Sequence, residues 1–233
     1  MKRQLGLEFR SWGGARQGAG RKRGSGLAPG HARRPRLGKN TPVHVTMRAV
    51  AEVRCLRAQV YFGIVRSMIA RAQRADFRVV HFSVQGSHIH LICEADDGRA
   101  LGRGIPFLSS MIARGVNFTR GRRGSMWRER YHRRDLTSPR QVRNALRYVL
   151  MNHDRHGPQD SHTGPALDPC SSALWFDGWA PAAAAALTAL AAHVRWGPPV
   201  VSAQGWMLRE GWRGRWRRAQ RSSVTPILGS PTR

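Results

Sequence analysis

The sequence predicts an α+β fold in which an antiparallel sheet carries helices on one face, the ferredoxin-like arrangement. Segments with alternating apolar residues, which are typical of strands, are interspersed with segments whose apolar residues recur every three or four positions, which are typical of helices. Two of the strand segments are separated only by a short turn, so we expect them to pair as a hairpin. The resulting order is strand, helix, strand, strand, helix, strand, helix.

The first four elements lie between residues 41 and 94. Residues 41–50 are β-branched and alternating, which predicts a strand. Apolar residues then recur every four positions from Leu56 to Ala72, which predicts a helix over about residues 54–75. The segments FRVVHFSV (77–84) and HIHLICE (88–94) predict two strands, joined by the turn Gln-Gly-Ser.

The remaining elements lie between residues 108 and 152. Helical spacing returns over residues 108–118, and residues 126–136 predict an exposed strand or extended segment. Ser138, Pro139 and Gln141 then form a capping box with proline at the first helical position, which marks the start of a last helix. We expect Val142, Ala145, Leu146 and Val149 to form the core face of this helix.

Positive charge dominates the composition. The 233 residues include 40 Lys and Arg against 13 Asp and Glu, a formal charge of +27, and the only lysines are Lys2, Lys22 and Lys39. Such a charge favours a polyanionic partner and argues against a small neutral ligand as the sole function. Arginine suits phosphate because its planar fork binds oxygens in pairs. An arginine-rich composition also arises from codon bias in GC-rich genomes.

Charge and pattern divide the chain into three regions. Residues 1–40 carry eleven basic residues, one acid and many glycines, so we expect a flexible arm. Residues 41–157 hold all the periodic patterns above and form the predicted folded domain. Residues 158–233 are a C-terminal extension with no assigned role, including an Ala-rich helix candidate at 181–194 and a Trp/Arg tail. Trp206, Trp212 and Trp216 in this tail could stack on unpaired bases or pack as one side of a short helix.

Cysteine content and hydropathy exclude further classes. The chain has three cysteines and no CxxC pair, so neither a disulfide scaffold nor a cysteine zinc site is supported. The first residues lack a signal-peptide core, and the most apolar run, at 181–194, is shorter than the roughly 20 residues that span a bilayer. We therefore expect a cytoplasmic, nucleoid-associated protein with no membrane partner.

Two histidines on one predicted strand are the first candidate site. Side chains at positions i and i+2 of a strand project from the same face, so His88 and His90 point together while Ile89 and Leu91 point into the core. Two adjacent imidazoles are half of a divalent metal site. The alternative is two sheet histidines with ordinary hydrogen-bond partners.

Tyr148 and Asn152 are the second candidate pair. Their spacing of four places both on one side of the last helix, at the flank of its core face. A residue at the flank can reach the sheet and still meet solvent. The alternative for Tyr148 is a boundary tyrosine with its ring packed and its hydroxyl in water.

Taken together, these residues resemble the single-tyrosine HUH transposases, particularly the REP-associated tyrosine transposases. That family carries a His-hydrophobic-His pair on a central strand, here His88-Ile89-His90, and about sixty residues later a helix with a tyrosine followed four positions on by Asn or Gln, here Tyr148 and Asn152. The resemblance covers about residues 40–157. Family members usually continue with Asn-Pro, whereas here Asn152 is followed by histidine.

The resemblance implies a mechanism. A Mg²⁺ or Mn²⁺ ion held by His88, His90 and Asn152 would polarise a scissile phosphate of single-stranded or hairpin DNA. Tyr148 would attack this phosphate, giving a 5′-phosphotyrosine that a 3′-hydroxyl can later attack to join strands. His153 or His156 could replace Asn152 as the third ligand. The sequence leaves open whether such an enzyme is mobile or domesticated, and whether it is a monomer or a homodimer.

Two other functions compete with this one. A non-catalytic nucleic-acid-binding protein would explain the charge and the tryptophans, but it leaves the histidine pair and Tyr148 unused. A nuclease of the three-carboxylate type ranks last, because no triad is evident among the thirteen acids.

Overall fold

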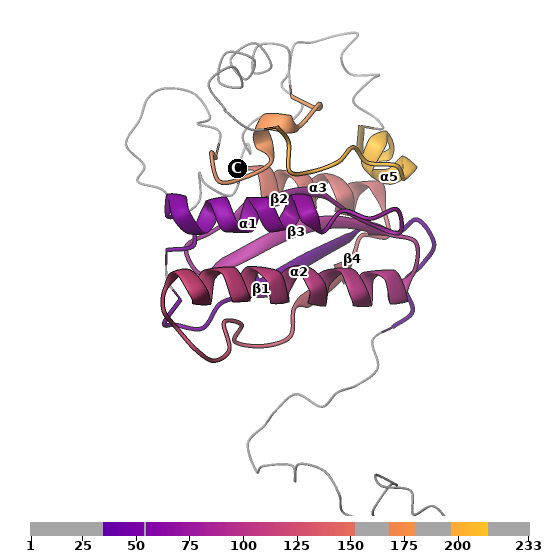
Figure 1. Cartoon of the computed structure of the whole chain (residues 1–233). Helices are drawn as coiled ribbons and strands as arrows, with labels where there is room; N and C mark the ends of the chain where they lie inside the picture. Colours follow the sequence, from indigo (N-terminus) through magenta and orange to yellow (C-terminus); the bar gives the residue numbers. More distant parts are fainter. Residues whose placement is uncertain (1–34, 54, 152–167, 180–196, 214–233) are drawn as a thin grey trace, which may run out of the picture. The chain divides into compact units, whose positions relative to one another are not determined.

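Four antiparallel strands form one sheet in the computed structural model, which describes residues 35–53, 55–151, 168–179 and 197–213. The strands are β1 (Val43–Arg48), β2 (Phe77–Val84), β3 (His88–Ala95) and β4 (His132–Asp135), in the spatial order β2-β3-β1-β4 (Figure 1). The predicted hairpin is confirmed, because β2 pairs antiparallel with β3. The extended segment predicted at 126–136 contains β4, which pairs with β1 at the edge of the sheet.

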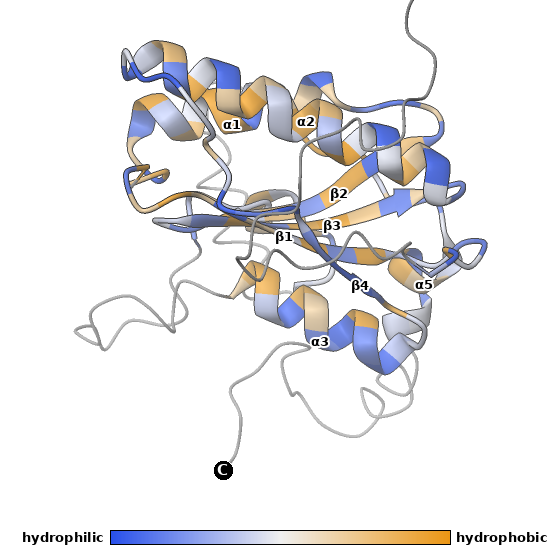
Figure 2. Cartoon of the chain, turned by 90° about the horizontal axis from the view of Figure 1, so that it is seen from below, coloured by the Kyte–Doolittle hydropathy of each residue, from blue (hydrophilic) through white to orange (hydrophobic). Residues whose placement is uncertain are grey.

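Helices cover both faces of the sheet, which corrects the prediction of helices on one face only. α1 (Gln59–Arg71) and α2 (Gly98–Thr119) lie on one face, and α3 (Pro139–Leu150) lies on the other (Figure 2). The first two helices share a core with Val45 and Leu91, whereas α3 packs against Val80 and Ile92. β2 is buried along its whole length, and a strand that is buried on both faces needs cover on both sides.

α2 begins ten residues before the predicted start. The side chain of Asp97 caps it by accepting a hydrogen bond from the backbone N–H of Ala100 at 2.7 Å. Three glycines and Pro106 near its start oppose helix formation, which is why the sequence pattern misses this part. Gly104 is explained by packing, since a Cβ there would overlap the ring of Phe77.

α1 is shorter than predicted, and its buried face differs by one position. The chain before it turns through Cys55, whose φ is +62°. Val65 and Ile69 are the fully buried residues of the helix, whereas Val60, part of the predicted stripe, is 59% exposed. The predicted stripe therefore marks the edge of the true core face.

The start of α3 is as predicted. The hydroxyl of Ser138 accepts a hydrogen bond from the backbone N–H of Gln141 at 3.3 Å, with Pro139 in the first turn. The side chain of Gln141 accepts in return from the backbone N–H of Thr137 at 2.8 Å, one residue before the position a standard capping box uses. The core face formed by Val142, Ala145, Leu146 and Val149 is confirmed.

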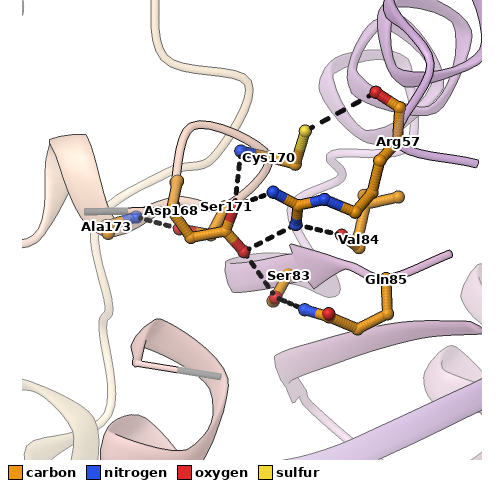
Figure 3. A network of polar contacts seen from close by, with 8 residues as sticks. All are labelled: Arg57, Ser83, Val84, Gln85, Asp168, Cys170, Ser171 and Ala173. Atoms are coloured by element: carbon orange, nitrogen blue, oxygen red, sulfur yellow. Dashed lines mark hydrogen bonds and ion pairs between the residues drawn. The ribbon is translucent and has the colours of Figure 1, made fainter. Parts of the chain in front are cut away.

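Residues from the predicted C-terminal extension pack on the outer edge of β2. The backbone N–H of Val84 donates to the carbonyl of Cys170 at 2.8 Å, and that of Ser172 donates to Phe82 at 2.9 Å. Asp168, whose side chain is fully buried, accepts from both terminal nitrogens of Arg57 and from the hydroxyl of Ser83 (Figure 3). These contacts cover an edge that would otherwise expose unpaired backbone groups.

A second part of this extension packs against α3. The short helices α5 (Trp206–Arg209) and η3 (Gly211–Arg213) place Trp212, 1% exposed, in the same core as Leu146. Trp212 is thus a packing residue, whereas Trp206 is 62% exposed. The domain boundaries at 40/41 and 157/158 stay predictions. The predicted flexibility of the arm, residues 1–40, also stays a prediction, because residues 1–34 lie outside the described residues. The helix candidate at 181–194 and Trp216 lie outside them as well.

Candidate active site

The floor of the candidate site is the α3-facing side of β3 and β1. His88 and His90 point to the same side, as predicted, with ring centroids 4.7 Å apart, while Ile89 and Leu91 are fully buried on the other side. In the register of the sheet, His90 lies opposite Thr46 of β1. The central strands therefore bring the two imidazoles beside polar residues of β1.

Tyr148 reaches this floor from α3. Its hydroxyl lies 3.4 Å from Nε2 of His90, and the two rings meet edge to face with centroids 5.0 Å apart. The residue is half-buried, which confirms the predicted position at the flank of the core face. The structure thus brings together a tyrosine and a histidine that are 58 residues apart in the chain.

His44 and Thr46, which sequence reasoning did not select, complete the cluster around His90. Nδ1 of His90 lies 3.2 Å from both Nε2 of His44 and Oγ1 of Thr46. The ring of His44 also lies 5.8 Å from that of Tyr148. The available signal was the alternation in β1, which places His44 and Thr46 on the face opposite Val43 and Val45; the pairing of β1 with β3 was not readable from the chain.

His44 is neutral near pH 7. Burial is the main reason why the pKa of its imidazole is lowered to about 4, and the neighbouring Arg134 and His132 contribute to that lowering. Because His44 and His90 are hydrogen-bonded to each other, the tautomer of one ring constrains the tautomer of the other. When Nδ1 of His90 carries its proton, Oγ1 of Thr46 and Nε2 of the neutral His44 are the acceptors. Nε2 of His90 then presents a lone pair on the side where Tyr148 lies.

These residues line a cavity of about 820 Å³ between the sheet and α3. Its charged side chains include three arginines, each from a different element: Arg48 of β1, Arg134 of β4 and Arg147 of α3. The full set of described lining residues is His44, Thr46, Arg48, His88, His90, His132, Arg134, Leu136, Gln141, Asn144, Ala145, Arg147, Tyr148 and Met151. A basic cavity of this kind suits a phosphate-bearing substrate.

The predicted third metal ligand cannot be placed. Asn152, with the alternatives His153 and His156, lies outside the described residues, which end at Met151 in this part of the chain. Within the described ranges, no three His, Cys, Asp or Glu side chains group as a metal site. A complete ligand set thus needs a further ligand type or a residue beyond those ranges, and the amide of Asn152 would meet both conditions.

The donors that are present fit a divalent transition-metal ion. His88 and His90 lie side by side, and the bond from Nδ1 of His90 to Thr46 is the second contact that a metal-binding histidine usually makes. Mg²⁺ prefers oxygen ligands, so in this site it would depend on Asn152, phosphate and water.

None of the helices within the described ranges is both long and apolar enough to cross a membrane.

No family model matches the chain, and no curated protein matches it. Among solved structures, the chain is similar to a REP-associated tyrosine transposase bound to a REP hairpin, with a TM-score of 0.45 and 18% identity over 54% of this chain and 73% of that chain. A likeness at this level carries no argument about function, which has to come from the residues of the site.

Proposed function

We propose that this protein is a transposase of the single-strand DNA type, an endonuclease and strand transferase that uses Tyr148 as its nucleophile. The observation that carries the proposal is the Tyr148 hydroxyl 3.4 Å from His90 in a cavity lined by three arginines. A nucleophile, an imidazole pair and a phosphate-binding surface then occupy one cleft, which is the set of groups that phosphate transesterification needs.

Tyr148 would attack the scissile phosphate through its oxygen. The new bond joins this oxygen to phosphorus, the bond from phosphorus to the 3′-oxygen breaks, and the leaving 3′-oxygen takes a proton to become a hydroxyl. A tyrosine has a reference pKa of about 10, so its proton must be drawn away. Because Nε2 of His90 would ligate the metal ion, the phenol proton would pass to solvent, and the arginines that line the cleft favour the phenolate form.

His88, His90 and Asn152 would hold Mg²⁺ or Mn²⁺. The ion, when bound, polarises the scissile phosphate and neutralises developing charge. Thr46 and His44 would keep the His90 proton on Nδ1 and so leave the Nε2 lone pair available on the cleft side. Tyr148 is half-buried at the flank of α3, which leaves its hydroxyl room to turn from His90 toward a phosphate.

The substrate would be single-stranded or hairpin DNA. Arg147 immediately precedes the nucleophile and lines the cavity, so it is placed to contact the DNA backbone. A non-catalytic nucleic-acid-binding protein, the competing function, would use the same basic cleft but would form no bond to DNA. A monomer and a homodimer are both compatible with this chemistry.

A covalent-adduct assay tests the proposal. The full chain is incubated with a labelled hairpin DNA bearing a single-stranded flank and Mn²⁺, and the products are separated on a denaturing gel. We expect a protein-linked product that Tyr148→Phe and His88→Ala abolish and that a matched variant on the opposite face, Tyr61→Phe, retains. Binding without an adduct would favour the competing function. Cleavage without a protein-linked product would identify a hydrolytic nuclease instead.

A further inference from the structure

We infer that a single DNA strand crosses the cleft along β1, with its phosphates held by Arg134 at one end and Arg48 at the other, on either side of Tyr148. This inference rests on the proposed function and names side chains that hold the substrate's backbone. Both arginines line the cavity, and both are exposed at its surface.

The register of the sheet places these arginines symmetrically about the nucleophile. Arg134 of β4 lies opposite His44, and Thr46, two residues further along β1, lies opposite His90, which the Tyr148 hydroxyl contacts. The next cleft-facing residue of β1, again two positions on, is Arg48. Measured along the direction of β1, the histidine that the nucleophile contacts thus lies in register midway between the two basic ends.

The spacing along β1 suits neighbouring phosphates. A strand rises by about 3.3 Å per residue, so each basic end lies roughly 7 Å along β1 from Thr46. An extended single strand can place the phosphates before and after the scissile one at such a separation, and arginine side chains are long enough to absorb the difference. A phosphate above Thr46 would then lie within reach of Tyr148, with one neighbour at each arginine.

The side chains of β4 point alternately to the two faces of the sheet, and this arrangement supports the path. Arg133 and Asp135 point to the α1–α2 side, where they form an ion pair at 2.6 Å. Arg134 points to the cleft instead, where it lines the cavity together with His44, the residue opposite it on β1. Within the described ranges, neither Arg48 nor Arg134 pairs with a carboxylate, so both can bind an external anion.

The salt dependence of DNA binding tests the path directly. Binding of the full chain to a fluorescein-labelled single-stranded oligonucleotide is followed by anisotropy at several NaCl concentrations without a divalent ion. Each phosphate contact contributes about 0.7 to the slope of log K against log salt for a single strand. We expect Arg48→Gln and Arg134→Gln each to lower the slope by about 0.7, and Arg48→Lys to restore most of it. Arg114→Gln, an exposed change on α2 at the opposite face, should leave it unchanged.

Unchanged slopes in both cleft variants, with unchanged far-UV circular dichroism, would overturn the inference, as would an equal loss in the Arg114 variant. The adduct assay keeps this result separate from the proposed function. An adduct with wild-type protein but unaltered slopes would retain the tyrosine chemistry and reject the path. Reduced slopes with no adduct would retain the path and reject the chemistry.

Discussion

Replacing Trp212 by alanine tests how the C-terminal residues support the helix that carries the nucleophile. The indole of Trp212 is 1% exposed, its ring centroid lies 5.3 Å from that of Phe176, and its N–H donates to the carbonyl of Leu208 at 2.9 Å. The backbone carbonyl of Trp212 also accepts from Nε of Arg143 on α3 at 3.0 Å. The side chain of Trp212 thus packs in one core with Leu146 of α3, with Phe176 and with Leu208 of α5.

The expected loss follows from this burial. Truncating a buried tryptophan to alanine costs about 3–5 kcal/mol, because apolar contacts are lost and a cavity remains. The lost N–H also leaves the Leu208 carbonyl without its donor, which adds about 1 kcal/mol. For a chain of this size, the total of about 4–6 kcal/mol corresponds to a fall in Tm on the order of 10–20 °C. Trp206→Ala is the matched control: its side chain is 62% exposed, so its effect should stay within about 0.5 kcal/mol.

Urea titration followed by far-UV circular dichroism measures both variants without depending on tryptophan fluorescence. The same proteins are then compared in the adduct assay below the melting temperature. Because α3 carries Tyr148, we expect the Trp212 variant to form adduct more slowly than the Trp206 variant. Equal stability of the two variants would refute the packing of residues 206–213 on α3.

Three further predictions concern single side chains. Asp168→Asn should destabilise the protein by about 3 kcal/mol in a thermal melt, because it removes the buried partner of Arg57; an unchanged Tm would contradict this. Burial lowers the pKa of His81 to about 4, so its neutral form contributes stability above pH 6.5 that is lost as pH falls toward 4. The stability gap between wild type and His81→Gln should therefore narrow by on the order of 3 kcal/mol over that window, and a constant gap would refute the assignment. Thr46→Val should weaken Mn²⁺ binding 10–100-fold by calorimetry through loss of its bond to His90, and equal affinity would argue against that role.

Local sequence patterns determined much of the secondary structure and part of the site. Alternation was enough to predict that His88 and His90 share a face, because adjacent strand residues always point to opposite sides. The capping residues located the start of α3, and helical spacing placed Tyr148 at the flank of its core face. The beginning of α2 was missed because glycines and Pro106 oppose a helix there, and one of these glycines, Gly104, is required by packing against Phe77, a contact with another part of the chain.

Apart from the β2–β3 hairpin, the tertiary structure alone decided which strands are neighbours, and it also decided which face each helix covers. His44 and Thr46 belong to the site only because β1 pairs with β3, and nothing within residues 41–50 encodes that partner. Likewise, α3 lies on the face opposite α1 and α2 because β2 and β3 offer apolar residues on both sides. The sequence by itself determined the charge, the chemical groups and their local directions. Long-range pairing brought Tyr148, His90 and the three arginines into one cleft, since such pairing depends on contacts between residues far apart in the chain.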